Sequence, residues 1–350
     1  MKIAFAIDFL VERDTDVFLL ELLLAGFPDA DIYCLAHAQG KILGRIETHR
    51  IHSSPLSRLV QSRAELRQRS WMLPSMVKQL RVSPDVDKLI IISSGWAHLI
   101  ATASKTERFV WCHQLSPRDL KLSGWKRIFS FYHEDLKERS LLKELQVTVA
   151  SQQLNQQLER NFRVIYPGIK TDDYVLIPDE QHTGEYPHHL VLLAGADVNR
   201  VRQVFALARE AKVPVKCVGR DEAFAAEKAL NDPNLEFIGD HCAATTAAFT
   251  HGARAVWCLS EDVFPAQALG ALACGRPAVV LDRPHNREIL PAEGTWFAGE
   301  DLGAVFQAAN RDYLSADKKQ LRRAGLKFNE RLFKNQIRAW AGVKPPKDED

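Results

Sequence analysis

Short apolar segments that end in small or polar residues alternate with helical stretches along most of the chain. Residues 2–8 (KIAFAID), 30–36 and 87–94 are typical of buried strands, and residues 14–27 have the composition of a helix. Parallel strands need a crossover connection, usually a helix. The alternation therefore predicts parallel sheets covered by helices, and it resumes at residues 189–196 after an interruption.

The interruption is rich in proline, glycine and charge and lacks helical periodicity, which is typical of a linker. A chain of 350 residues is long enough for two domains. We therefore predict two doubly wound α/β domains with an interdomain cleft, where ligands of such sheets bind. The predicted parts are an N-terminal domain at 1–168, a linker at 169–188, a C-terminal domain at 189–325, a helix at 326–342 with the option of crossing back to the first domain, and a tail at 343–350.

Composition excludes several classes of protein. A hydrophobic content of 46% and a net charge of +2 fit a globular protein without whole-molecule attraction to nucleic acid. The sequence has neither a signal-peptide pattern nor an apolar run of about 18 residues, so we expect a cytoplasmic protein without a membrane span. The six cysteines form no C-x-x-C pair, which argues for reduced thiols and against a metal site.

Four segments follow one another in a recognisable order: FPDADIYCL (27–35), WCHQ (111–114), RVIYPGIKTDDY (163–174) and LACGRP (272–277). In this arrangement the chain resembles the GT-B glycosyltransferases of family 4, particularly bacterial mannosyltransferases of surface-polysaccharide assembly, over nearly its whole length. The resemblance implies retaining, metal-independent transfer of a hexose to a glycan or lipid-linked acceptor. The donor would be GDP- or UDP-hexose, and no cofactor is needed.

On the acceptor side, the resemblance implies that Asp8 and His113 are catalytic and that Arg118 and Trp96 lie nearby. An imidazole at the end of a strand can hydrogen-bond a sugar hydroxyl and orient the reacting centre. An ordinary strand-end histidine is the alternative for His113. The Trp96 ring is suited either to stacking on a sugar or to packing in the core.

On the donor side, the resemblance implies a site formed by Arg200, Gly219, Asp262 and Glu288. The family pattern has a second acid eight residues after the first, and in this chain Gly270 stands there instead of an acid. Glycine cannot accept hydrogen bonds from ribose hydroxyls, and a lost charged hydrogen-bond partner costs about 1.5–3 kcal/mol. Arg200 is one residue beyond the position that the resemblance implies for a phosphate-binding cation.

Two glycine-rich turns of the family are also replaced. Asp14 and Thr15 stand in the first, where one of them is expected to cap a helix that begins near Asp16. Pro284 and His285 stand in the second, and the histidine is either a ligand contact or an exposed loop residue.

A basic segment separates two predicted strands of the first domain. Between residues 57 and 81, six basic residues and one acid are interleaved with apolar ones. This pattern suits amphipathic helices on an anionic membrane surface, and a solvated basic face is the alternative. The predicted membrane contacts are Arg58, Arg63, Arg67, Arg69, Lys78 and Arg81.

These observations lead to one main expectation and two alternatives. We expect a glycosyltransferase, cytoplasmic or peripheral at the inner face of the cell membrane, that acts in cell-surface polysaccharide assembly. The first alternative is a catalytically inactive relative that binds a partner enzyme, a glycan or a lipid headgroup, because several donor-site residues are altered together. The second is an enzyme with a lipid-phosphate donor, which would need no ribose contacts.

Overall fold

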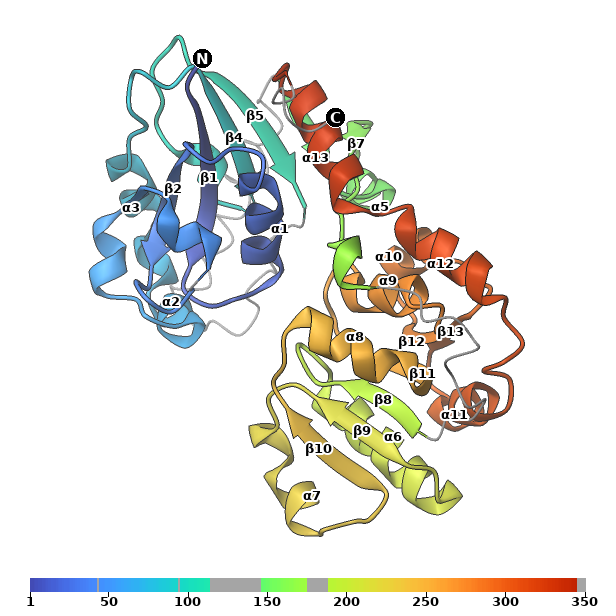
Figure 1. Ribbon diagram of the computed structural model, residues 1–350. Coiled ribbons are helices and arrows are strands. Elements are labelled where there is room, and N and C mark those ends of the chain that lie inside the picture. The colour runs from blue at the N-terminus through green and yellow to red at the C-terminus, as the bar shows by residue number, and fades with distance from the viewer. Residues whose placement is uncertain (43, 94, 114–145, 175–187, 345–350) are drawn as a thin grey trace. The chain divides into compact units, whose positions relative to one another are not determined.

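The computed structural model describes residues 1–42, 44–93, 95–113, 146–174 and 188–344. Its internal packing divides the chain into two units. Unit 1 comprises Met1–Pro167 and Arg331–Asp350, and unit 2 comprises Gly168–Glu330. Each unit is built around one parallel sheet with helices packed against it (Figure 1).

The sheet of unit 1 has seven described strands in the order β3-β2-β1-β4-β5-β6-β7, and every pair is parallel. The strand order reverses between β1 and β4, which makes their carboxyl ends the switch point of the sheet. The strands are β1 Ile3–Leu10, β2 Asp31–His37, β3 Ile51–Ser53, β4 Lys88–Ser93, β5 Glu107–Cys112, β6 Val147–Val149 and β7 Arg163–Val164.

Apolar residues cover both faces of this sheet. Helices α1 (Thr15–Leu24) and α13 (Glu330–Trp340) contribute to one core cluster, and α3 (Leu73–Gln79) and α5 (Gln152–Gln157) contribute to the other. Asp14 caps α1 by accepting a hydrogen bond from the Val17 amide at 2.9 Å, which confirms the predicted cap. The remaining elements are α2 Arg63–Gln68 and the 3-10 turns Arg45–Thr48, Pro55–Arg58, Ser70–Met72 and Ala97–Leu99.

The sheet of unit 2 has six described strands in the order β10-β9-β8-β11-β12-β13, again all parallel. Its switch point lies between β8 and β11. The strands are β8 His188–Leu192, β9 Val215–Val218, β10 Leu235–Gly239, β11 Ala253–Cys258, β12 Ala278–Leu281 and β13 Thr295–Ala298. The helices are α6 Val198–Ala211, α7 Ala225–Ala229, α8 Ala243–His251, α9 Ala266–Ala273, α10 Pro284–Ile289, α11 Leu302–Arg311 and α12 Lys318–Leu326, with 3-10 turns at Thr171–Asp173 and Glu222–Phe224.

The C-terminal segment forms two helices, α12 and α13, and α13 lies within the helix predicted at 326–342. The backbone between them pairs with Ile169: the Ile169 amide donates to the Phe328 carbonyl at 2.7 Å, and the Glu330 amide donates to the Ile169 carbonyl at 2.9 Å. These bonds take backbone groups that a continuous helix would use. Beyond the break, Phe333 and Ile337 are buried in the core of unit 1.

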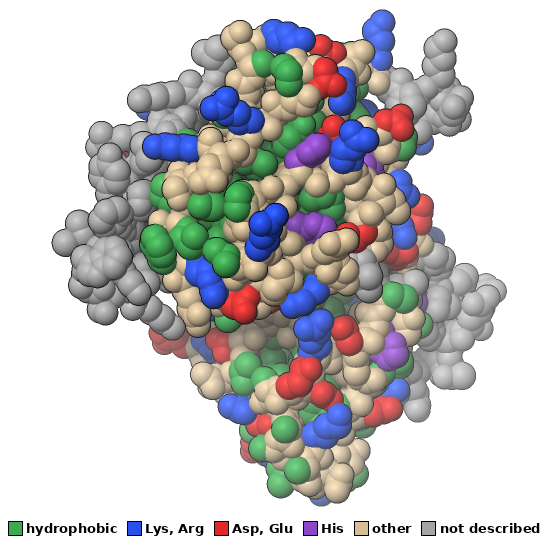
Figure 2. Space-filling view, turned by 90° about the vertical axis from the view of Figure 1, so that its left-hand side faces the viewer, with side chains coloured by type: hydrophobic (Ala, Val, Ile, Leu, Met, Phe, Trp, Pro, Cys, Tyr) green, Lys and Arg blue, Asp and Glu red, His purple; other side chains and the backbone are tan. Residues whose placement is uncertain are grey.

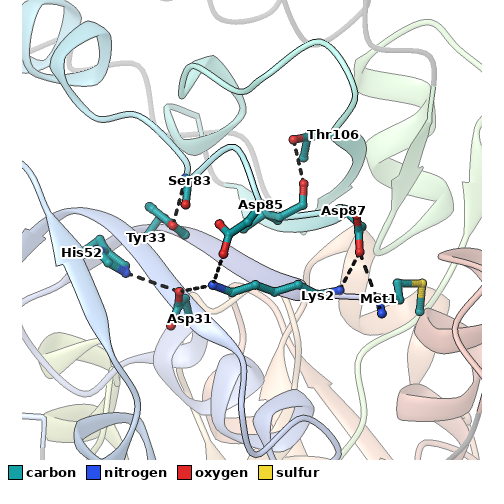
Figure 3. Close-up of polar contacts among 10 residues, drawn as sticks. Met1, Lys2, Asp31, Tyr33, His52, Ser83, Asp85, Asp87 and Thr106 are labelled. Carbon is teal, nitrogen blue, oxygen red and sulfur yellow. Dashed lines mark hydrogen bonds and ion pairs between the residues drawn. The ribbon is translucent and has the colours of Figure 1, made fainter.

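The amino ends of the unit 1 strands carry a polar cluster (Figure 3). Lys2 Nζ lies 2.8 Å from Asp85 Oδ2 and 3.5 Å from Asp31 Oδ2, and the Tyr33 ring stacks on His52 with 4.6 Å between centroids. Lys2 also lowers the pKa of Asp85 to about 2. The cluster ties the starts of several strands together, at the edge opposite to the one where ligands of such sheets bind.

Candidate active site

Asp8 lies at the switch point of unit 1 and is 1% exposed. Its Oδ1 accepts hydrogen bonds from the Trp96 amide at 3.0 Å and from the Ala97 amide. These bonds fasten β1 to the turn that follows β4, so the predicted residues Asp8 and Trp96 meet here. The Trp96 side chain packs in the core of the unit, which is one of its two predicted roles.

His113 directly follows β5 and is only 4% exposed. Its Nε2 lies 2.6 Å from Oδ1 of Asp16, in the first turn of α1, and its ring stacks on Trp111 with 5.7 Å between centroids. Nδ1 has no hydrogen-bond partner among the residues that the structure describes. Asp16 is a contact that the sequence analysis missed, although an acid in the first turn after β1 must lie at the same sheet edge as a residue that follows β5.

Burial and charge act in opposite directions on His113. Burial alone lowers its pKa, but the Asp16 carboxylate, through its charge and its hydrogen bond, and the Asp8 charge raise it. The net pKa lies above the ordinary value. Asp16 therefore favours the protonated ring and fixes its orientation.

The loop between β1 and α1 is filled by its own side chains. Arg63 pairs with Asp14, and the Arg63 amide donates to Glu12 Oε1 at 3.0 Å. Arg13 donates through Nη1 to the Ile42 carbonyl at 2.6 Å and pairs with Glu21. Asp14, Glu12 and Arg13 thus make internal bonds within unit 1.

The switch point of unit 2 brings the loops after β8 and β11 together. The Asp197 amide donates to the Leu259 carbonyl at 2.9 Å. Gly195 has a φ of +69°, and a Cβ there would lie 3.1 Å from Ser260 Oγ and 3.3 Å from Asp262 Oδ2. The predicted donor residue Asp262 therefore lies at the place where ligands of such sheets bind.

The other predicted donor residues lie around the same sheet edge. Arg200 is in the first turn of α6, and its Nη1 donates to the Gly299 carbonyl at 2.7 Å. The Asp197 carboxylate accepts from the Asn199 and Arg200 amides, so the start of α6 is capped by its own chain. Gly219 follows β9 with a φ of +126°, and a Cβ there would lie 3.0 Å from Leu193 Cβ.

The loop after β12 and the helix that follows it bring Arg283, which the sequence analysis did not assign, and His285 to the same edge. Arg283 holds Glu261 through two contacts, Nη2 to Oε1 at 2.6 Å and Nε to Oε2 at 3.0 Å. His285 is 8% exposed rather than lying in an exposed loop, and burial lowers its pKa. Glu288, a predicted donor residue, lies half-buried on the same short helix, α10.

Tyr174 occupies the space beside Gly270. A Cβ on Gly270 would lie 2.6 Å from Cε1 and Cζ of the Tyr174 ring and 2.9 Å from its hydroxyl. The Tyr174 carbonyl accepts from Arg322 Nη1 at 2.9 Å, and the same nitrogen donates to the Ala273 carbonyl at 2.6 Å, which anchors the ring's backbone to α9. No side chain fits at position 270 while the ring stays there, which gives a physical reason for the missing acid.

The basic segment forms α2, α3 and two 3-10 turns. Leu59 and Trp71 are 46% and 55% exposed, and Arg69 is half-buried. The side of the molecule that carries α2 and α3 shows basic side chains interleaved with apolar ones (Figure 2). Arg118, the remaining predicted acceptor-side residue, lies outside the described residues.

Solved structures match this arrangement over nearly the full chain. Sucrose-phosphate synthase from Thermosynechococcus elongatus matches with a TM-score of 0.69 and 14% identity over 96% of this chain and 97% of its own. HepE from Anabaena, solved in complex with UDP, matches with a TM-score of 0.68 and 13% identity over 97% of this chain and 99% of its own. The chain has the GT-B fold.

A third GT-B match is AviGT4, a glycosyltransferase involved in avilamycin A biosynthesis, with a TM-score of 0.55 and 14% identity over 98% of this chain and 99% of its own. No protein-family model matches the sequence, and the comparison with curated proteins gives no significant match. At these identities the likeness concerns the fold. Membership of family 4 and specificity for mannose stay predictions.

Proposed function

We propose that this GT-B protein is a glycosyltransferase that moves a hexose from a nucleotide-sugar to a glycan or lipid-linked acceptor in cell-surface polysaccharide assembly. The observation that carries the proposal is the switch point of unit 2, where Gly195 keeps the space beside Ser260 and Asp262 free of a side chain. HepE, which has the same fold, was solved with UDP and also with UDP-glucose, which favours a nucleotide-sugar as the donor.

We assign the donor to unit 2 and the acceptor to unit 1. The donor would be surrounded by Asp262, Glu288, Gly219 and Arg200. His113 would hydrogen-bond the acceptor hydroxyl, with Asp16 holding its ring and Asp8 fixing the neighbouring turn. Retention of configuration without a metal is the stereochemical course that we propose, and the anomeric product of a turnover assay tests it.

Calorimetric titration with UDP, GDP and their hexose conjugates tests the donor assignment. We expect micromolar binding that weakens about tenfold or more in Asp262→Ala, because a charged hydrogen-bond partner is lost. Glu236→Ala is the matched control, since Glu236 is an exposed carboxylate on β10 paired with Lys216 at 3.5 Å. If no nucleotide or conjugate binds, the proposed function is wrong.

Two observations favour a second candidate function, namely a catalytically inactive GT-B protein that binds a partner enzyme, a glycan or a lipid headgroup. The Tyr174 ring takes the space beside Gly270, and Asp14 with Arg63 fills the loop after β1. Glycan binding without nucleotide binding, measured on the same protein preparation, would support this candidate over the first.

We further propose that the basic segment attaches the protein to an anionic membrane surface. Each basic side chain near such a surface contributes about 1 kcal/mol, so changing four exposed ones to Gln should weaken binding about a hundredfold to a thousandfold. Flotation with phosphatidylserine vesicles measures this. The four test positions are Arg58, Arg67, Lys78 and Arg81, and a control protein carries Gln at Arg209, Arg220, Arg311 and Arg323 of unit 2. Equal flotation of both variants would contradict the proposal.

A further inference from the structure

The ion pair between Arg283 and Glu261 spans the two loops that follow β12 and β11. The guanidinium offers two N–H groups side by side, and the carboxylate takes both of them, at 2.6 and 3.0 Å. Both side chains are about half exposed. Because both groups are in contact with water, an external anion can compete with the carboxylate for Arg283.

The position of the pair is that of a ligand site. Arg283 is close enough to Asp197, in the loop after β8, for that charge to act on it. Since Asp197 pairs with the backbone of Leu259 beyond β11, Arg283 belongs to the switch point. It therefore stands at the crevice where doubly wound sheets bind their ligands.

His285 supplies an independent sign that a ligand belongs here. Its ring is more than nine-tenths buried and close enough to Glu261, Arg283 and the Asp262 backbone for these groups to influence it. Its Nε2 nevertheless has no hydrogen-bond partner among the described residues. A buried polar nitrogen without a partner is costly, and a ligand hydroxyl at this place, or a phosphate oxygen when the ring is protonated, would satisfy it.

We propose that Arg283 binds the diphosphate of a nucleoside diphosphate ligand, and that Glu261 is an internal competitor that holds Arg283 until the ligand displaces it. This assignment rests on the proposed function, because it names the cation of the same donor site.

The chemistry favours phosphate over the carboxylate that is now in place. A guanidinium binds phosphate through the same pair of parallel hydrogen bonds that it makes to Glu261. A diphosphate carries more charge than one carboxylate and is held at the same time by the rest of the site. The released Glu261 side chain, already half exposed, returns to water at little cost.

Calorimetric titration of the full chain with UDP, GDP and inorganic pyrophosphate tests the proposal through variants with opposite effects. Arg283→Gln should bind roughly ten- to a hundredfold more weakly, because two charge-assisted hydrogen bonds are lost. Glu261→Gln should bind about two- to fivefold more tightly, because the internal competitor loses its charge. Arg283→Lys, which keeps the charge but loses the fork, should lie between wild type and Arg283→Gln.

Arg287→Gln is the matched control. Arg287 makes an equally close two-contact pair with Asp282, at 2.6 and 2.8 Å. Its guanidinium lies over Phe297 of β13, three strands from β8 in the sheet order. We expect it to bind UDP as wild type does.

The outcomes separate the two proposals. UDP affinity that is equal in wild type, Arg283→Gln and Arg287→Gln would overturn the role of Arg283 and leave the proposed function standing. Weaker binding in Glu261→Gln would overturn the competitor role, because it would mean that Glu261 supports the ligand. If neither the wild type nor Glu261→Gln binds any of UDP, GDP and pyrophosphate, this inference and the proposed function are both wrong.

Discussion

Gly270→Ala is the substitution that best tests how unit 2 fills the place of the missing acid. Position 270 lies inside α9, where alanine is more favourable than glycine by about 1 kcal/mol. Opposing this, the new Cβ would lie 2.6 Å from two carbons of the Tyr174 ring, and overpacking of this kind costs about 1–3 kcal/mol. We therefore expect Gly270→Ala to lower the free energy of unfolding of unit 2 by about 0–2 kcal/mol in the wild-type background.

The sign should reverse once the ring is removed. In a Tyr174→Ala background no ring meets the new Cβ, so Gly270→Ala should stabilise unit 2 by about 1 kcal/mol. The double-mutant cycle should then give a coupling energy of about 1–3 kcal/mol between the two positions. Gly303→Ala in α11 is the matched control, since a Cβ there meets nothing closer than 3.4 Å.

Hydrogen exchange of peptides from α9, read together with urea unfolding, reports the stability of unit 2 separately from that of unit 1. If Gly270→Ala stabilises the wild-type protein as much as it stabilises Tyr174→Ala, the ring does not hold the space and the reasoning is wrong. The same reasoning applies to Gly270→Glu. In the Tyr174→Ala background this change should tighten UDP binding, whereas in the wild-type background it should not.

Three further predictions concern stability. Burial lowers the pKa of His189 to about 3, so below about pH 6.5 the unfolded state binds a proton that the folded state does not. His189 should therefore contribute a loss of ~2 kcal/mol between pH 7 and pH 5, and His189→Leu should reduce the loss measured in urea titrations by that amount, leaving the part due to His188, whose pKa burial lowers to about 4. Asp16 raises the pKa of His113, so the stabilisation that it provides is present below about pH 6.5 and is lost as the pH rises through the raised pKa. Asp16→Asn should therefore cost more stability at pH 6 than at pH 9, and it should lower the His113 pKa measured by NMR. An unchanged His113 pKa would contradict this prediction. Gly325→Ala should lower the stability measured by thermal unfolding by ~3 kcal/mol or more, because the new Cβ would lie 2.6 Å from the backbone nitrogen of Ala273, which cannot move aside. A loss of stability no larger than that of Gly270→Ala would argue against so close a packing of α12 on α9.

Much of the fold follows from local pattern in the sequence. The strands that were predicted, such as 2–8 and 87–94, are nearly continuous apolar runs, as expected for parallel strands covered on both faces. Strand β3 has three residues, of which only the first is apolar, so its pattern is too short to detect. The break between α12 and α13 depends on backbone pairing with Ile169, more than 150 positions earlier, which no local pattern records.

The candidate site was less predictable because its contacts join distant parts of the chain. His113 was identified through its place after a strand, but its partner Asp16 lies 97 positions away and looked like an ordinary first-turn acid. Arg283 was passed over because a charged residue in a loop carries no signal of its own. Only the strand order places the loops after β8, β11 and β12 at one edge.

Two positions that depart from the family pattern, Asp14 and Gly270, and the loop residue Arg283 each have a partner within their own unit. Gly270 faces the ring of Tyr174, Asp14 pairs with Arg63 and caps α1, and Arg283 pairs with Glu261. Simple loss of a binding site would leave cavities and unpaired charges, each of which costs stability. Of the three arrangements, the ring against Gly270 is closed to any side chain, whereas the half-exposed Arg283–Glu261 pair opens at small cost. A nucleotide that binds this protein should therefore gain its affinity from the diphosphate more than from the ribose, so pyrophosphate should retain a larger share of the UDP binding free energy than uridine does.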